Sequence, residues 1–295
     1  MAGIKNIVKF RGVGLHSGEA FNMTLRPGNG GVVFTRSDLG KSVLARFDNV
    51  VGTEMRSTSL EDGKARVQTI EHLMAAFYAL GIDNAVVETD GAEIPIMDGC
   101  AEEFYKKLKP VVAGRKPKTI IVKKEIVARA RDLRLKMPLL MRILGLFRRG
   151  GRDGYVKISP ARKAEFSARL VYNNKIIGDQ KFALKDIKDF EKDVARARTF
   201  GNLAEWDALK KRGMARGANE ENVIALDGDR VANPKPWGLR WKNEFARHKV
   251  LDMLGDFALA GGVLQGRVES YKGSHALNNL ALRMLFSDPD NYEII

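Results

Sequence analysis

The sequence divides into two halves of similar layout, and this repeated layout limits the fold more than any other feature. In each half, short runs of β-forming residues separated by turns are combined with helical segments. The β-like runs are residues 7–10, 20–25, 31–35, 64–68 and 84–88, and then 119–127, 155–158, 164–172 and 262–270. The helical segments are 69–80, 100–108 (after a turn at Asp98-Gly99), 200–211 and 243–260. This mixture of strands and helices in both halves predicts an α+β fold.

The first of these helices carries the clearest start and stop signals. Thr69 stands where an N-cap residue is expected, and Gly81 stands where a helix stop is expected. The apolar positions at helical spacing between them are Leu73, Ala76, Phe77 and Leu80. The pattern therefore predicts a helix with an apolar inner face.

The length of the chain, 295 residues, suits two domains of about 150 residues each. The stretch 110–118 contains Gly114 and Pro117 and has the composition of a linker. We therefore expect a first α+β domain over residues 1–114 and a second over residues 119–295.

Positive charge is concentrated in one part of the chain. The 50 Lys+Arg exceed the 36 Asp+Glu by 14, which by itself suggests nucleic acid or an anionic membrane as a partner. Between Arg115 and Lys157, however, fourteen basic residues accompany three acidic ones, and this stretch of +11 leaves only +3 for the rest. The charge is therefore local, and nucleic acid is not the expected partner, although a nucleic-acid-binding module stays the weaker alternative.

The cysteine content and the hydropathy indicate the compartment. Cys100 is the single cysteine, which excludes an internal disulfide framework and fits a reducing compartment. No segment reaches the roughly 18 apolar residues of a membrane span, and the first ten residues lack the features of a secretory signal. We therefore expect a cytoplasmic protein.

Two of the four histidines have neighbours that suit a metal site. His248 and Asp252 stand four residues apart in a helical segment, so both side chains lie on one face, and Asp256 continues this face. His72 could supply a third ligand, and the adjacent Glu71 would then suit a general base for water at the metal. The alternative is a solvated glutamate and a packed histidine in the first turn of a helix, where acidic residues are favoured anyway.

Several common catalytic patterns are missing. The sequence contains no His-Glu-x-x-His helix and no Gly-x-Ser-x-Gly motif. Gly40-Lys41-Ser42 does not complete a Gly-x-x-x-x-Gly-Lys-Ser/Thr phosphate loop, because Thr35 stands at the position of the first glycine. A thermolysin-type site, a serine hydrolase of that class and a phosphate-loop enzyme are therefore not expected.

At the level of motifs, the chain closely resembles the UDP-3-O-acyl-N-acetylglucosamine deacetylase (LpxC) family, zinc amidases of lipid A biosynthesis and hence of lipopolysaccharide. The stretches that carry the resemblance are 12–18 (Gly-Val-Gly-Leu-His-Ser-Gly), 69–76 (Thr-Ile-Glu-His-Leu-Met-Ala-Ala), 81–84 (Gly-Ile-Asp-Asn), 93–99 (Glu-Ile-Pro-Ile-Met-Asp-Gly), 197–201 (Ala-Arg-Thr-Phe-Gly), 248–256 (His-Lys-Val-Leu-Asp-Met-Leu-Gly-Asp) and 275–279 (His-Ala-Leu-Asn-Asn). They follow the family order and contain all four histidines, so the resemblance covers nearly the whole chain.

The resemblance implies a role for each matching residue. His72, His248 and Asp252 would bind Zn²⁺, and Glu71 would be the general base. His275 would stabilise the transition state and protonate the leaving amine, and Asp256 would orient it. Thr199 would polarise the acetyl carbonyl, and Lys249 would contact the diphosphate of the UDP-linked substrate. His16 would line the site without being catalytic.

The resemblance also implies two similar α+β domains with the active site between them, and a passage for the acyl chain near residues 202–224. Its candidate lining residues are Phe200, Leu203, Trp206, Leu209 and Met214. The alternative interpretation of the last four is the inner face of an amphipathic helix. One departure from the family pattern is Gly273-Ser274, where the family usually has Ser-Gly before the histidine. If the family glycine has a positive φ, the exchange would shift His275.

A second departure is the basic, partly apolar segment at residues 129–152, where Pro138 can start a short interfacial helix. We expect peripheral contact with the anionic inner membrane; the alternative is a surface loop that packs back on its domain. A monomer is the expected oligomeric state. The main alternative function is a catalytically impaired paralogue that binds a sugar nucleotide or a membrane.

Overall fold

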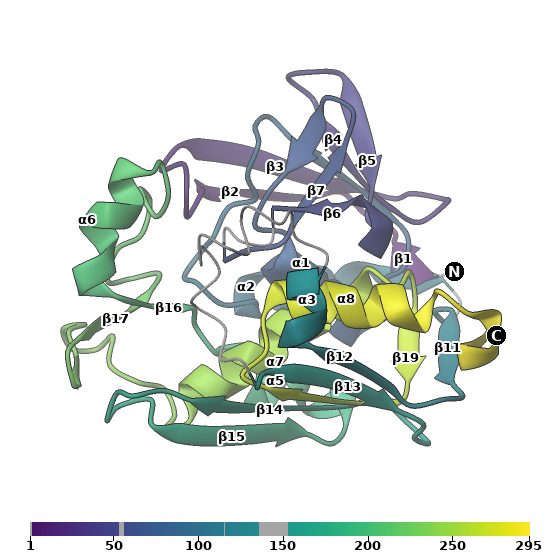
Figure 1. Cartoon of the computed structure of the whole chain (residues 1–295). Helices are drawn as coiled ribbons and strands as arrows, with labels where there is room; N and C mark the ends of the chain where they lie inside the picture. Colours follow the sequence, from purple (N-terminus) through teal and green to yellow (C-terminus); the bar gives the residue numbers. More distant parts are fainter. Residues whose placement is uncertain (1, 53–55, 115, 136–152) are drawn as a thin grey trace.

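Two five-stranded sheets, one from each half of the chain, form the outer layers of the molecule (Figure 1). The computed structural model describes residues 2–52, 56–114, 116–135 and 153–295. The helices between the two sheets are α1 (Glu71–Leu80), α2 (Glu102–Leu108), α7 (Glu244–Ala258) and α8 (His275–Leu285). The layers are therefore sheet, helices and sheet.

The two large sheets have the same strand pattern. The first, in spatial order, is β2 (Val8–Val13), β3 (Ala20–Arg26), β9 (Ala85–Thr89), β4 (Val32–Arg36) and β5 (Lys41–Leu44). The second is β12 (Ile126–Arg129), β13 (Tyr155–Ser159), β20 (Arg267–Tyr271), β14 (Glu165–Val171) and β15 (Asp179–Leu184). In both, the successive pairings are antiparallel, antiparallel, parallel and antiparallel.

The order along the chain is also the same in both halves. Two hairpins come first, then a helix (α1 or α7), then the strand that enters the middle of the sheet (β9 or β20), and then a second helix (α2 or α8). The expected α+β class with two similar halves is therefore confirmed. The boundaries of the expected domains, 1–114 and 119–295, stay a prediction.

Shorter elements join and extend this frame. The remaining strands are β1 (Ala2–Ile4), β6 (Val50–Val51), β7 (Ser59–Asp62), β8 (Ala65–Val67), β10 (Val112–Gly114), β11 (Thr119–Val122), β16 (Phe200–Asn202), β17 (Ile224–Asp227), β18 (Arg230–Val231), β19 (Val263–Gln265) and β21 (Tyr292–Ile294). The remaining helices are α3 (Ala130–Leu135), α5 (Phe190–Asp193) and α6 (Leu203–Lys211), with 3₁₀ turns at Phe47–Asn49, Lys109–Val111, Ile187–Asp189 and Pro289–Asn291. The expected linker thus contains β10, which pairs with β1.

The two halves share one apolar core, and α1 and α7 pack directly against each other in it. Gly255 of α7 is the point of closest approach, because a Cβ atom there would lie 2.0 Å from the backbone oxygen of Glu71. Only glycine allows the two helix backbones to come this close. The packing places the first turn of α1 beside the middle of α7.

The start of α1 differs from the sequence prediction, whereas its end agrees. Thr69 does not cap the helix: its φ is +58°, its hydroxyl donates to Glu93 Oε1 at 2.9 Å, and Ile70 occupies the N-cap position. The prediction was wrong because a tertiary partner competes for the hydroxyl. Gly81 ends the helix in the left-handed conformation at φ +67°, as expected.

The expected interfacial helix after Pro138 lies outside the described residues. Within the described ranges, every helix is too short or too polar to cross a lipid bilayer.

Candidate metal centre and active site

Three buried side chains from the facing helices α1 and α7 form a cluster of metal-ligand type. His72 lies in the first turn of α1, and His248 and Asp252 lie one turn apart on α7. His248 Nε2 is 3.2 Å and His72 Nε2 is 3.8 Å from Asp252 Oδ1, and one potential ligand atom from each residue lies within 4.8 Å of the others. The structure thus brings together the three residues that the sequence singled out as ligands.

The spacing and the chemistry of these donors fit a tetrahedral zinc ion. Ligand atoms about 2.0–2.1 Å from such an ion lie about 3.3 Å from one another, which is close to the two separations found here. His248 Nδ1 lies 3.0 Å from the carbonyl oxygen of Ala197, which can only accept, so Nδ1 carries the hydrogen and Nε2 offers its lone pair to the cluster.

Burial keeps both imidazoles neutral, as metal ligation requires. Desolvation, with the nearby His248 as a second cause, lowers the pKa of His72 to about 3. Burial also lowers the pKa of His248, although Asp252 opposes this shift. Burial alone would raise the pKa of Asp252, but the surrounding His248 and Lys249 hold it below its usual range. The cluster therefore offers two neutral nitrogens and one anionic oxygen.

Glu71 is the first residue of α1 and lies beside this cluster. It is 3% exposed, and Oε2 accepts a hydrogen bond from the backbone N–H of Thr58 at 3.0 Å. Burial raises the pKa of Glu71 to about 7, against the opposing effect of His275. A carboxylate with a pKa near neutrality has the proton affinity of a general base.

His275 begins α8 and also lies beside the cluster. Its Nδ1–H donates to Asp256 Oδ2 at 2.8 Å, and its Nε2 lies 3.9 Å from Asp252 Oδ2. Burial alone would lower its pKa, but Asp256 outweighs this and raises the pKa to about 9. Asp256 also accepts from Asn278 Nδ2 at 2.7 Å and from the Thr58 hydroxyl at 2.5 Å. An imidazolium is thus stabilised with one nitrogen facing the metal centre.

The backbone at the exchanged pair Gly273-Ser274 is not left-handed. Ser274, at the position of the family glycine, is extended with φ −152°, and Gly273 has no positive φ. A Cβ atom on Gly273 would lie 2.0 Å from Ser270 Oγ. Ser274 is the N-cap of α8, and its hydroxyl accepts from the backbone N–H of Leu277 at 3.3 Å. Glycine at 273 thus provides space and serine at 274 caps the helix, and His275 keeps its hydrogen bond to Asp256.

Phe200 and Lys249, two further predicted residues, border the cluster, and Thr199 precedes Phe200 in the chain. The ring of Phe200 lies 6.2 Å from that of His248, and Lys249 Nζ lies 5.6 Å above the Phe200 ring. In this structure Lys249 Nζ also donates to Asp252 Oδ2 at 2.7 Å. The backbone of Thr199 is held by two hydrogen bonds. Its N–H donates to the carbonyl oxygen of Gly99, and its own carbonyl oxygen accepts from the N–H of Ile224.

The residues proposed for the acyl passage form a separate group. Leu203, Trp206 and Leu209 belong to α6, which stands apart from α1 and α7 at the left of Figure 1, and Met214 follows it. Trp206 and Leu209 pack on a small apolar cluster of Ala215, Ala218 and Val223. This packing agrees with the inner face of an amphipathic helix, and their contact with an acyl chain stays a prediction.

His16 lies in a loop that contacts the same region. Its Nδ1 accepts from the backbone N–H of Ala215 at 3.4 Å. Glu93 holds this loop through the N–H groups of His16 and Ser17, at 2.8 and 2.9 Å. His16 thus contacts the segment that follows α6, and its place in the lining of the active site stays a prediction.

Two polar residues of the site were not singled out from the sequence. Asn278 lies within a recognised motif, so the motif could have drawn attention to it. Thr58 lies in none of the recognised motifs, and only the folded structure brings it beside Glu71, Asp256 and His275.

Comparison with known proteins agrees with this geometry. A family profile described as UDP-3-O-acyl N-acetylglycosamine deacetylase (LpxC) matches residues 2–287. Proteins named UDP-3-O-acyl-N-acetylglucosamine deacetylase from Campylobacter fetus, Geotalea uraniireducens and Helicobacter hepaticus are 38%, 39% and 36% identical to this chain. The alignments cover 96%, 99% and 99% of this chain and 90%, 90% and 92% of those relatives. The chain therefore belongs to the LpxC family of UDP-3-O-acyl N-acetylglycosamine deacetylases.

Proposed function

We propose that this protein hydrolyses the N-acetyl group of UDP-3-O-acyl-N-acetylglucosamine, releases acetate, and thereby serves lipid A biosynthesis. The observation that carries the proposal is the buried group of His72, His248 and Asp252, with the buried Glu71 and His275 beside it. Membership of the deacetylase family supports the choice of substrate.

The metal we propose is zinc, held by His72, His248 and Asp252. Its contribution when bound would be Lewis-acid activation of water and of the amide carbonyl. Two neutral imidazoles and one carboxylate, with space for a further ligand, are a common donor set for catalytic zinc.

The proton transfers are assigned to Glu71 and His275. Glu71 takes a proton from the attacking water, for which its raised pKa suits it. His275, whose Nδ1–H is tied to Asp256, donates from Nε2 to the amide nitrogen as the C–N bond breaks. The products are acetate and a free amine on the sugar. An amine is a poor leaving group unless it is protonated, so a positioned acid is required.

The substrate would be held by side chains around this centre. We propose that Thr199 polarises the acetyl carbonyl and that Lys249 binds the diphosphate, leaving Asp252 when it does so. Phe200, Leu203, Trp206, Leu209 and Met214 would line the path of the acyl chain.

Acetate release, measured together with the metal content, tests this function. The purified protein is expected to contain about one zinc ion per chain and to release acetate. Chelation should reduce turnover about 100-fold or more, and added zinc should restore it.

Each rival function predicts a different result in this assay. A catalytically impaired paralogue would bind zinc or substrate without releasing acetate. A nucleic-acid-binding module would bind any duplex in a salt-sensitive manner and be indifferent to chelators. Either result would contradict the proposed function.

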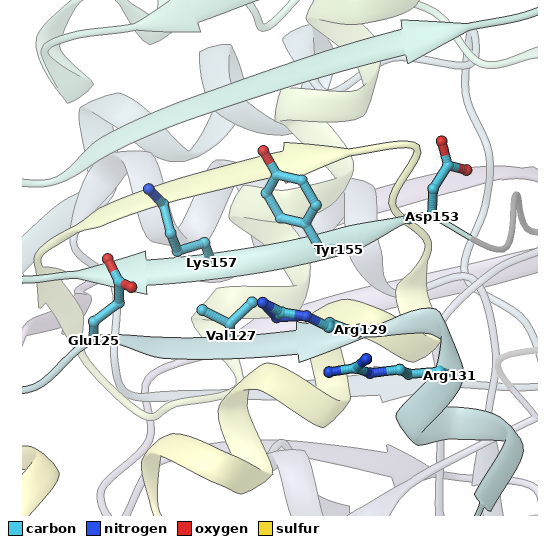
Figure 2. Close-up of a pocket in the computed structure, with 8 residues that line it drawn as sticks. Glu125, Val127, Arg129, Arg131, Asp153, Tyr155 and Lys157 are labelled. Carbon is cyan, nitrogen blue, oxygen red and sulfur yellow. The ribbon is translucent and has the colours of Figure 1, made fainter.

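We also propose that the enzyme is a cytoplasmic monomer that contacts the anionic inner membrane peripherally. The support is the basic stretch between Arg115 and Lys157 and the acyl chain of the substrate. Among the described residues of this stretch, Arg129, Arg131 and Lys157 line a surface pocket on β12, β13 and the start of α3, together with the acidic Glu125 and Asp153 (Figure 2). Between residues 136 and 152 the sequence adds Arg142, Arg148, Arg149 and Arg152.

Deletion of residues 136–149 tests the membrane contact. The wild type is expected to co-float with vesicles of anionic phosphatidylglycerol but not with vesicles of neutral phosphatidylcholine. The deletion variant should lose this binding, because about 1 kcal/mol of attraction per basic residue is removed. Zinc content serves as the control for folding. Equal binding of both proteins to anionic vesicles would contradict the proposal.

A further inference from the structure

Thr58 is anchored by its backbone to the beginning of α1. Its N–H donates to Glu71 Oε2 at 3.0 Å, and its carbonyl oxygen accepts from the N–H of Ile70 at 3.3 Å. The residue is only 2% exposed and immediately precedes β7. Both backbone bonds fix Thr58 relative to the proposed general base.

The side chain of Thr58 reaches the other proton-transfer group. Its hydroxyl donates to Asp256 Oδ1 at 2.5 Å, and Oγ1 lies 3.1 Å from His275 Nδ1. Asp256 is on α7 and His275 is on α8, 198 and 217 positions further along the chain. One residue therefore joins groups from α1, α7 and α8.

The hydroxyl controls the orientation of the Asp256 carboxylate. Oδ2 of Asp256 accepts from His275 Nδ1 and Asn278 Nδ2, at 2.8 and 2.7 Å, whereas Oδ1 accepts from Thr58. A carboxylate can rotate about its terminal bond, and donors on both oxygens oppose this rotation. With Nδ1–H held by Asp256, the imidazole presents Nε2 toward Asp252.

We propose that Thr58 is a positioning residue that fixes the proposed base Glu71 and the proposed acid His275 relative to each other. The inference rests on the proposed function and adds a residue to its machinery. Thr58 acts through Asp256 and His275, so its contribution belongs to the chemical step. Loss of the hydroxyl should therefore lower kcat and leave KM nearly unchanged.

Two substitutions at this position separate the hydroxyl from the shape of the side chain. Thr58→Val keeps the branched shape and the backbone hydrogen bonds but removes the O–H group. We expect kcat to fall about 10- to 100-fold, the effect of losing one hydrogen bond to a charged group, with KM within about two-fold. Thr58→Ser keeps the O–H group and should restore kcat to within about three-fold of wild type.

Ser59→Ala is the matched control. Ser59 is the next residue, is 1% exposed, and its hydroxyl has no hydrogen-bond partner among the described residues. Its replacement removes a buried hydroxyl from the same segment without touching Asp256 or His275. We expect wild-type kcat and KM for this variant.

A spectroscopic measurement tests the same contact without turnover. The Nδ1 proton of His275 reports the hydrogen bond to Asp256 and can be observed by NMR with ¹⁵N-labelled histidine. Its resonance is assigned by comparison with His275→Ala, in which it is absent. Thr58→Val should shift or broaden this resonance, whereas Thr58→Ser and Ser59→Ala should leave it in place.

The outcomes distinguish this inference from the proposed function. If the wild type releases no acetate, the proposed function fails, and the His275 resonance alone decides whether Thr58 positions the imidazole. If Thr58→Val keeps the wild-type kcat, or leaves the resonance unchanged, the inference is overturned. It is also overturned if Thr58→Ser loses as much activity as Thr58→Val, because the hydroxyl would then not be the cause.

Discussion

Glu71→Gln is expected to reduce acetate release by about 10²- to 10⁴-fold, the usual contribution of a general base. Glutamine has nearly the same shape and can still accept from the N–H of Thr58, but it cannot take a proton from water. The metal ligands are unchanged, so the zinc content should stay at the wild-type level. Steady-state acetate release and metal analysis of the same samples measure both quantities.

Glu102→Gln is a suitable control for this experiment. Glu102 is also the first residue of its helix, α2, but its carboxylate pairs with Lys106 at the surface. A glutamine there should leave turnover unchanged. Full activity in Glu71→Gln would remove Glu71 as the base, and loss of zinc would show that its main effect is on the metal centre.

Glu244→Ala is expected to lower the free energy of unfolding by about 3–5 kcal/mol. Glu244 and Arg198 form an ion pair at 3.0 Å, and both side chains are almost fully buried. Glu244 Oε1 also accepts from the N–H of Arg198, and Oε2 accepts from the N–H of Arg240. Without the carboxylate, a buried guanidinium loses its counter-charge and two backbone donors lose their acceptor. Urea titration of the purified variant measures the change.

The exposed pair between Glu165 and Arg267 gives the comparison. These residues approach to 2.9 Å, but the Arg267 side chain is half exposed. Glu165→Ala should therefore cost less than about 1 kcal/mol. If Glu244→Ala lowers the free energy of unfolding no more than Glu165→Ala does, then burial does not make the pair of Glu244 and Arg198 more important for stability than an exposed pair. Glu244→Ala is also expected to disturb Thr199, because Arg198, the partner of Glu244, precedes Thr199 in the chain.

The sequence predicted the parts of the fold that depend on local patterns. The helix ending at Gly81 and the strands with alternating apolar residues follow from spacing and turn chemistry. The role of Thr69 was mistaken, because the partner that competes for its hydroxyl, Glu93, is 24 positions away. The expected strand over residues 119–127 is in fact two strands in different sheets, β11 and β12, which a continuous run of β-forming residues does not reveal.

For the candidate site as well, local sequence patterns predicted only the residues that lie on one element. The i, i+4 spacing of His248 and Asp252 is visible in the sequence because both lie on one helix. The approach of His72 depends on the packing of α1 against α7, so the sequence offered His72 only as one of two interpretations, and the resemblance to a known family favoured the ligand. Thr58 was missed because its partners are brought to it by three separate elements.

Because α1 and α7 come from different halves of the chain, the candidate metal site forms only when the two halves pack together. Each half supplies only part of the donor set, His72 from one and His248 with Asp252 from the other. A chain in which both halves are folded but not docked would have two intact sheets and yet lack a complete metal site. The proposed catalysis therefore requires that α1 packs against α7. A side chain at Gly255, far in sequence from His72, would force α1 and α7 apart and so separate the candidate metal ligands.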